Sequence, residues 1–179
     1  SSRLTSVMMD LHVSSAITGV VNAVYNQANM VLVVLDNSTT AMTGHQPHPG
    51  TGRTVMGEIV QKINIEQVLR GIGVTEIETI NPLELEASVS CVKRMAEKSG
   101  VRAIIFKAPC IAVTKPKAPL HVDQDSCIGC KKCIRDLGCP AIVMNDGKIC
   151  IDASMCTGCH LCSQVCPVCA IAGGDDKNE

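Results

Sequence analysis

The chain has 179 residues, 46% of them hydrophobic, and a formal net charge of −1, so we expect a folded protein of one domain or two small ones. One Tyr, one Phe and no Trp exclude the aromatic stacking surfaces that bind single-stranded nucleic acid, and the balanced charge excludes the basic footprint of a DNA or RNA binder. The longest purely apolar run, Met30 to Leu35, is far shorter than the ~20 residues that span a bilayer. No secretory signal is visible at the start, so we expect a cytoplasmic protein whose thiols stay reduced.

Helical and extended patterns alternate along the first 106 residues. Apolar residues recur at helical spacing in 16–28, and the β-branched run Met30–Asp36 that follows is typical of a buried strand in a parallel sheet. Further along, the sequence predicts a short helix at 65–73, a strand at 76–80, a helix within 82–100 and a strand at 101–106. This alternation predicts an α/β domain with a parallel sheet.

A Pro- and Lys-rich stretch, Thr114–Pro119, ends the alternation, and we place a domain boundary there. We expect residues 1–117 to belong to the α/β domain, 118–172 to form a small α+β domain, and 173–179 to be a solvated tail.

The second domain contains an internal near-repeat. Its first copy reads Cys127-Ile-Gly-Cys130-Lys-Lys-Cys133, and its second copy reads Cys156-Thr-Gly-Cys159-His-Leu-Cys162. Between the copies, alternating apolar residues flank Asn145-Asp146-Gly147, which predicts a β-hairpin.

Cysteines are concentrated in this domain, where ten of the twelve lie between Cys127 and Cys169. The second copy continues to Cys166-Pro167 after three residues, which is the bacterial ferredoxin run for a 4Fe-4S cluster. The first copy reaches Cys139-Pro140 after five residues, and we expect a bulge in that turn. In two-cluster ferredoxins the fourth cysteine of each run ligates the other cluster. We therefore predict one cluster on Cys127, Cys130, Cys133 and Cys166, and a second on Cys156, Cys159, Cys162 and Cys139.

Three other uses of these cysteines fit the spacing less well. Structural zinc uses four cysteines from two separated Cys-x2-Cys pairs, whereas here three evenly spaced thiols and a more distant Cys-Pro occur twice. Cys156 to His160 matches the haem-attachment pattern Cys-x-x-Cys-His, but both cysteines already belong to the ferredoxin run. A disulfide framework requires an oxidising compartment. For the other cysteines we expect the role of small buried hydrophobes; these are Cys91, Cys110, Cys150 and Cys169.

A long Gly-, Pro-, Thr- and His-rich segment follows the first buried strand. Open α/β sheets bind ligands at the carboxyl ends of their strands, and Asn37 lies directly at such an end. Asn side-chain and backbone carbonyl oxygens are suitable Mg2+ ligands, and glycines allow the backbone to approach a ligand closely. The residues alone indicate a phosphate or metal loop, with an ordinary connection as the alternative.

Four segments, in chain order, resemble the C-terminal part of the large subunit of indolepyruvate ferredoxin oxidoreductase. They are LDNSTTAMTGHQPHPGTG at 35–52, KAPC at 107–110, CIGCKKCIRDLGCPAI at 127–142 and CTGCHLCSQVCP at 156–167. The resemblance covers nearly the whole chain. It implies that the first domain is part of a thiamine diphosphate-binding domain and the second a dicluster ferredoxin domain.

The resemblance also implies a cofactor site in the first domain. In this family Mg2+ and thiamine diphosphate are held by an Asp of a Gly-Asp motif, by an Asn at the next strand end and by a carbonyl two residues later. Asn37 and the carbonyl of Thr39 match the last two. Beside the cofactor lie the matching residues Thr43, Gly44, His45 and Gln46. Met8 and Met9 stand where the family has Gly-Asp, and Asp10 is the nearest carboxylate to replace it.

The implied activity is oxidative decarboxylation of aryl 2-oxoacids to acyl-CoA, with electrons passing through two 4Fe-4S clusters to ferredoxin. The expected partners are the remaining domains or subunits of the oxidoreductase, since this family's large subunit is several times longer, and the chain alone is expected to be inactive. Two alternatives stay open: a dicluster ferredoxin-type electron carrier, and a subunit of another 2-oxoacid oxidoreductase. Two histidines, His45 and His48, lie in the cofactor loop, whereas His12, His121 and His160 are expected to be structural.

Overall fold

The computed structural model describes residues 3–8, 13–39, 48–111, 113–115 and 117–173. It divides into two compact units, Ser1–Thr114 (unit 1) and Lys115–Glu179 (unit 2). Each unit is described by itself. Among the described residues, no helix combines the length and the apolar character needed to cross a membrane.

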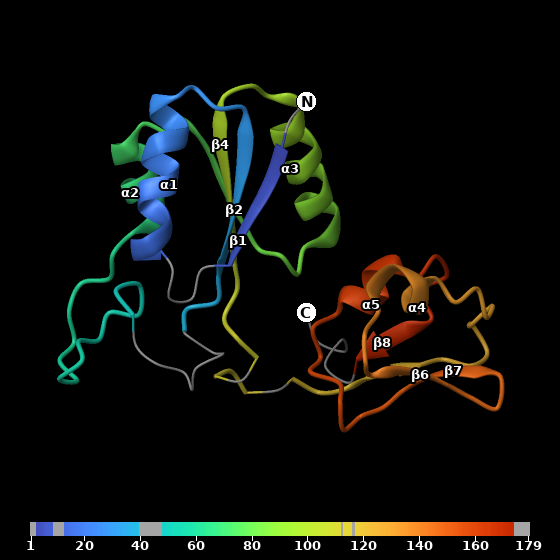
Figure 1. Cartoon of the computed structure of the whole chain (residues 1–179). Coiled ribbons are helices and arrows are strands. Elements are labelled where there is room, and N and C mark those ends of the chain that lie inside the picture. The colour runs from blue at the N-terminus through green and yellow to red at the C-terminus, as the bar shows by residue number, and fades with distance from the viewer. Residues whose placement is uncertain (1–2, 9–12, 40–47, 112, 116, 174–179) are drawn as a thin grey trace. The chain divides into compact units, whose positions relative to one another are not determined.

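Unit 1 is built on a parallel sheet of the order β1-β2-β4-β3. The strands are β1 (Arg3–Met8), β2 (Met30–Asp36), β3 (Glu76–Ile80) and β4 (Val101–Lys107). The helices are α1 (Val13–Tyr25), α2 (Ile65–Ile72) and α3 (Leu85–Glu97). Figure 1 shows α1 and α2 on one face of the sheet and α3 on the other. The expected α/β class with a parallel sheet is thereby confirmed.

The core of unit 1 lies on both faces of β2 and β4, whose side chains alternate between the two helix layers. Towards α1 and α2, the buried cluster consists of Val20, Leu32, Val34, Leu69, Val74, Ala103 and Ile105. Towards α3, it consists of Val31, Cys91, Met95 and Ile104. Central strands buried on both faces explain why β2 is apolar without interruption from Met30 to Leu35, and why β4 is apolar up to Phe106 apart from Arg102.

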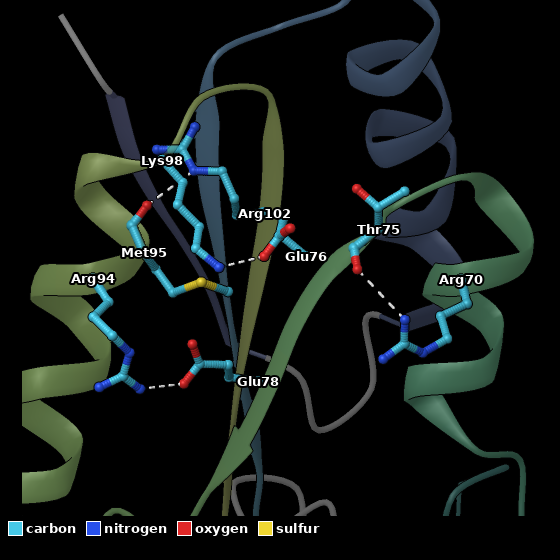
Figure 2. A network of polar contacts seen from close by, with 8 residues as sticks. All are labelled: Arg70, Thr75, Glu76, Glu78, Arg94, Met95, Lys98 and Arg102. Carbon is cyan, nitrogen blue, oxygen red and sulfur yellow. Dashed lines mark hydrogen bonds and ion pairs between the residues drawn. The ribbon is translucent and has the colours of Figure 1, made fainter.

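Polar contacts fasten α3 to the sheet (Figure 2). Arg94 donates to the Glu78 carboxylate at 2.5 Å, and Lys98 pairs with Glu76. Arg102 is completely buried and donates through Nε to the carbonyl of Met95 at 3.0 Å. These contacts join β3 and β4 to the helix that covers them.

Unit 2 contains two antiparallel strand pairs and two short helices. The strands are β5 (Leu120–Val122), β6 (Ile142–Asn145), β7 (Lys148–Ile151) and β8 (Ile171–Gly173), and the helices are α4 (Lys132–Leu137) and α5 (Leu161–Val165). Strand β5 pairs with β8, and β6 pairs with β7 in the predicted hairpin, whose turn residues Asp146 and Gly147 both have positive φ. Each copy of the near-repeat therefore supplies one cysteine loop followed by one short helix.

The four cysteines outside the ferredoxin runs differ in exposure. Cys91 is buried, as expected, and burial together with a hydrogen bond to Glu78 raises the pKa of its thiol to about 11. Cys110 and Cys150 are half-buried, and Cys169 is exposed with φ of 51°. The expectation of a buried hydrophobe is therefore wrong for Cys169, because the left-handed turn after Cys166 carries its side chain to the surface.

Candidate functional site

Eight cysteines of unit 2 line two cavities, four around each. Cavity A is lined by Cys127, Cys130, Cys133 and Cys166, and has a volume of about 20 Å³. Cavity B is lined by Cys139, Cys156, Cys159 and Cys162, and has a volume of about 270 Å³. Each cavity thus receives three cysteines from one copy of the repeat and the fourth from the other copy. This is the same grouping that the spacing predicts for two clusters.

The two cysteine loops have the same local geometry. Gly129 and Gly158 have φ of 65° and 67°, and Lys131 and His160 both have φ of 60°. Each loop opens with the N–H of its first cysteine donating to an Asp carbonyl four residues earlier, at 3.0 Å in both copies. The left-handed residues curl each loop tightly, so that two thiols of the loop and the third, in the first turn of the helix that follows, line one cavity.

The longer spacer of the first copy is absorbed at the end of its helix. Helix α4 has six residues and α5 has five. Gly138 ends α4 with φ of 57°, and its N–H donates to the carbonyl of Ile134. The added residues therefore extend the helix and form a left-handed glycine turn, after which Cys139 lines cavity B. This turn takes the place of the expected bulge.

The lining of both cavities is almost entirely apolar apart from the cysteines. Around cavity A it consists of Val122, Ile128, Ile149, Pro167, Val168, Ala170 and Ile171. Around cavity B the one polar side chain besides the cysteines is Thr157. Apolar walls exclude water and lower the local dielectric, which is one of the means by which proteins set the potential of an iron–sulfur cluster.

Hydrogen bonds and pKa shifts agree with the two groups. The N–H of Leu120 donates to Cys156 Sγ at 3.5 Å, and the N–H of Ala170 donates to Cys166 Sγ at 3.3 Å. Burial raises the pKa of Cys133, with smaller contributions from Cys130 and Cys166. Burial also raises the pKa of Cys162 to about 11, with contributions from Cys159, Cys156 and Cys139.

The donor chemistry fits iron–sulfur clusters. Within the described residues, no three His, Cys, Asp or Glu side chains lie close enough together to hold a single metal ion. The fit therefore rests on four thiols around each cavity, on apolar walls and on backbone N–H groups directed at sulfur, which are the features that bind and tune such clusters.

Asn37 lies at the carboxyl edge of the sheet in unit 1, directly after β2. Its carbonyl accepts the N–H of Cys110 at 3.0 Å, and its side-chain Oδ1 accepts the N–H of Thr39 at 3.1 Å. Thr39 is buried. Ala108 donates to the carbonyl of Asp36 at 3.1 Å, so the chain after β4 continues the ladder beyond the strand ends and fixes the backbone of Asn37.

The other predicted residues of the cofactor loop are placed as follows. Asp10, Thr43, Gly44, His45 and Gln46 lie outside the described residues. The ring Nδ1 of His48 accepts the N–H of Gly50 at 3.1 Å, so this nitrogen is used within its own turn. A cofactor contact by His45 or His48 stays a prediction.

A polar cavity of about 400 Å³ at the same end of the sheet was not foreseen from the sequence. Asp36 and Lys107 line it, with 3.7 Å between Lys107 Nζ and Asp36 Oδ2. Lys62 and Glu66 add further charges to the lining. Its lining comes from separate segments with no common motif, so no local pattern could have indicated it.

Comparisons with known proteins agree with this division. Residues 6–106 match the thiamine pyrophosphate enzyme family, C-terminal TPP binding domain, and residues 120–167 match a 4Fe-4S dicluster domain. The chain therefore belongs to the thiamine pyrophosphate (thiamine diphosphate) enzymes and carries a dicluster ferredoxin-type domain.

Its relatives specify the resemblance further. The chain is 44% identical over 159 residues to indolepyruvate oxidoreductase subunit IorA of Methanothermobacter thermautotrophicus, covering 88% of this chain and 26% of the relative. It is 39% identical over 165 residues to IorA of Archaeoglobus fulgidus, covering 89% of this chain and 26% of the relative. The similarity to the C-terminal part of this subunit is thus confirmed, and the chain spans about a quarter of these relatives.

Proposed function

We propose that this chain is the electron-transferring C-terminal part of a thiamine diphosphate-dependent 2-oxoacid:ferredoxin oxidoreductase of the indolepyruvate type. The observation that carries the proposal is the presence, in one chain, of a thiamine diphosphate-binding domain and two cavities that are each lined by four cysteines. A thiamine enzyme that hands electrons to a one-electron carrier needs both parts.

In unit 2 the proposed role of each cysteine follows from its cavity. The thiolates of Cys127, Cys130, Cys133 and Cys166 hold one 4Fe-4S cluster, and those of Cys139, Cys156, Cys159 and Cys162 hold the other; when bound, the clusters accept and release single electrons. The raised thiol pKa values mean that binding must displace protons from Cys133 and Cys162. Apolar walls keep water away, and the N–H groups of Leu120 and Ala170 stabilise negative charge on sulfur.

In unit 1 the proposed role of Asn37 and Thr39 is to hold Mg2+ and, through it, the cofactor diphosphate. The Asn37 side-chain oxygen and the Thr39 carbonyl are hard oxygen ligands at the end of a rigid central strand. Asp10 is proposed as the carboxylate of this site. Bound thiamine diphosphate supplies the carbanion stabilisation that allows a 2-oxoacid to lose CO2.

The rest of the reaction is proposed to lie on other domains or subunits. The chain covers 26% of the relative from Methanothermobacter thermautotrophicus, so we assign the groups that activate the cofactor and most of the substrate pocket to the remaining part. The proposed partners are that part, an aryl 2-oxoacid, coenzyme A and ferredoxin, and the proposed location is the cytoplasm.

The test is to assemble the chain anaerobically with the remaining part of the enzyme. We expect indolepyruvate and coenzyme A to reduce methyl viologen only when thiamine diphosphate and Mg2+ are present, and pyruvate and 2-oxoglutarate to be poorer substrates. Asn37→Ala should weaken thiamine diphosphate binding, whereas Asn145→Ala, at the end of β6, should leave it unchanged. An assembly that holds iron and sulfide but does not bind thiamine diphosphate would instead support the plain electron carrier.

A further inference from the structure

The two cysteine loops can be compared position by position, because they are copies of one repeat with the same backbone geometry. We call residues 127–133 loop A and residues 156–162 loop B; each provides three cysteines to the cavity of the same letter. Gly129 of loop A corresponds to Gly158 of loop B, and Lys131 corresponds to His160. Differences between the loops therefore arise from their surroundings and their side chains.

Loop B is covered by the segment through which the chain enters unit 2. Gly158 is buried, and a Cβ at this position would lie 2.7 Å from the carbonyl oxygen of Ala118 and 2.7 Å from Lys117 Cβ. The N–H of Lys117 donates to the carbonyl of Thr157 at 3.4 Å. No partner protein can reach this part of loop B without displacing the chain itself.

Loop A is open at the equivalent positions. A Cβ at Gly129 would meet nothing within 4 Å, and both Gly129 and Cys130 are exposed. Ile128, which precedes Gly129, is 67% exposed although it also lines cavity A. Ile128 therefore presents apolar surface directly beside Cys127, and a partner protein that covered it would gain from its burial.

The side chains next to the cysteines differ in charge. Loop A and α4 present Lys131, Lys132 and Arg135, all exposed, and the corresponding residues of the second copy are His160, Leu161 and Gln164. Two of these cations lie directly between Cys130 and Cys133.

Acidic residues near loop A leave these cations available. Asp136 is 3.9 Å from Lys132, and because this pair is half-exposed it holds the lysine only weakly. The side chain of Asp123 accepts hydrogen bonds from the N–H of Asp125 and the hydroxyl of Ser126, so it is engaged in the turn before the loop. Asp125 is the one further acidic residue within residues 120–137.

We propose that loop A and the exposed face of α4 form the docking surface for an acidic one-electron carrier protein. Ile128 provides an apolar centre, and Lys131, Lys132 and Arg135 provide a cationic rim, which together give contact area and electrostatic steering. The inference rests on the proposed function, because it takes the sites of unit 2 to be redox-active. Transfer makes and breaks no bond: the enzyme loses one electron, and the iron–sulfur centre of the acceptor gains it.

Charge complementarity determines the kind of partner. The whole chain has a net charge of −1, so the chain as a whole does not attract an anionic surface, and attraction at loop A must come from the local group of cations, which an acidic protein of small footprint matches.

The test is direct binding of a purified acidic bacterial-type ferredoxin to the assembled enzyme, measured by surface plasmon resonance as a function of salt. The docking variant is Lys131→Gln/Lys132→Gln/Arg135→Gln. Its matched control is Lys93→Gln/Lys115→Gln/Lys148→Gln, which removes the same number of exposed cations elsewhere. We expect the docking variant to bind about tenfold more weakly at low ionic strength and to lose most of the salt dependence, because exposed pairs contribute roughly 2- to 3-fold each.

The same samples separate this inference from the function on which it rests. Methyl viologen is a small cation that needs no docking surface, so both triple variants should reduce it at the rate of the unchanged enzyme, and only the docking variant should reduce ferredoxin slowly. Equal ferredoxin affinity for the two triple variants would overturn the docking proposal. Failure of every sample to reduce methyl viologen, with the binding difference intact, would overturn the proposed function alone.

Discussion

Crossed ligation is most sharply tested at Cys139. In sequence Cys139 is six residues from Cys133 and seventeen from Cys156, yet it lines cavity B together with Cys156, and Cys166 lines cavity A. Cys139→Ala should therefore remove the cluster of cavity B, whose other three cysteines lie farther from Cys139 in sequence than Cys133 does. Cys130→Ala and Cys159→Ala serve as references for the loss of cluster A and cluster B.

The expected magnitude follows from the grouping of the cysteines. Each cavity has four thiols and receives only one from the other copy of the repeat, so a single substitution should affect one cluster and leave the second complete. Iron and acid-labile sulfide should fall from about eight to about four per chain in each variant. Gly138 should keep its left-handed turn in Cys139→Ala, because its N–H bond to Ile134 does not involve the thiol.

The assay is redox-resolved EPR of anaerobically reconstituted protein. The spectrum that remains in Cys139→Ala should match that of Cys159→Ala, and the spectrum of Cys166→Ala should match that of Cys130→Ala. Cys169→Ala is the control, because this thiol is exposed and lines neither cavity. If Cys139→Ala and Cys130→Ala lose the same signal, the five-residue spacer folds back on its own loop and the crossed assignment is wrong.

Three further predictions concern the supports of the sites and of the fold. Gly158→Ala should lower the free energy of unfolding by about 2–4 kcal/mol, because it adds a clash with Ala118 to the cost of a positive φ, whereas Gly129→Ala should lower it by only about 1 kcal/mol. Thermal unfolding of the reconstituted protein compares the two variants. Equal losses of stability would contradict the tight packing on loop B. Cys110→Pro, which removes the N–H bonded to the Asn37 carbonyl, should weaken thiamine diphosphate binding in the assembled enzyme about tenfold, whereas Cys110→Ala should leave it unchanged. Calorimetry measures the affinity of both variants. Weaker binding in Cys110→Ala would show that the thiol, and not the backbone N–H, supports the site. The hydrogen bond from Arg94 holds the pKa of Glu78 below its ordinary value, so the carboxylate should stabilise unit 1 at neutral pH and lose this effect as the pH falls through its folded pKa. Glu78→Gln should lower the urea midpoint at pH 7 by an amount equivalent to less than about 1 kcal/mol, and should lower it less at pH 4. A larger effect at pH 4 than at pH 7 would contradict the lowered pKa.

Local patterns explain how far the fold could be predicted from the sequence. Strands β2 and β4 are buried on both faces, so their apolar runs are visible without knowledge of their partners. Helix α3 begins three residues after Pro82 and ends three residues before Gly100, so these two residues indicate the helix but not its exact ends. Strand β1 has mixed polar and apolar residues and exists through its parallel pairing with β2, and β5 and β8 have three residues each and pair across fifty positions. No local pattern can indicate such strands, because their stability comes from the partner strand.

The same reasoning separates the predictable from the unpredictable part of the candidate site. Metal-ligand spacing is a local property, so the sequence indicates the two groups of three cysteines. The exchange of the fourth cysteine follows from the pattern of two-cluster ferredoxins, and the structure gathers the same groups of four around two cavities. Asn37 could be indicated for a similar reason, since it directly follows a visible strand. The backbone bond from Cys110 that fixes Asn37 could not, because it joins residues 73 positions apart.

The repeat itself predicts two equivalent cysteine loops, and the structure shows that they are not equivalent. Equal spacing and equal φ angles describe what a loop needs in order to surround a cluster, and both copies satisfy that requirement. What distinguishes them is the chain that packs outside: Lys117 and Ala118 occupy the surface of loop B, and nothing within 4 Å occupies the corresponding surface at Gly129. A covered cluster site suits electron transfer within the enzyme, and an open one suits electron transfer to a carrier protein. On the docking proposal, the order in which the two sites are used depends on the chain that covers loop B together with the side chains that loop A itself presents.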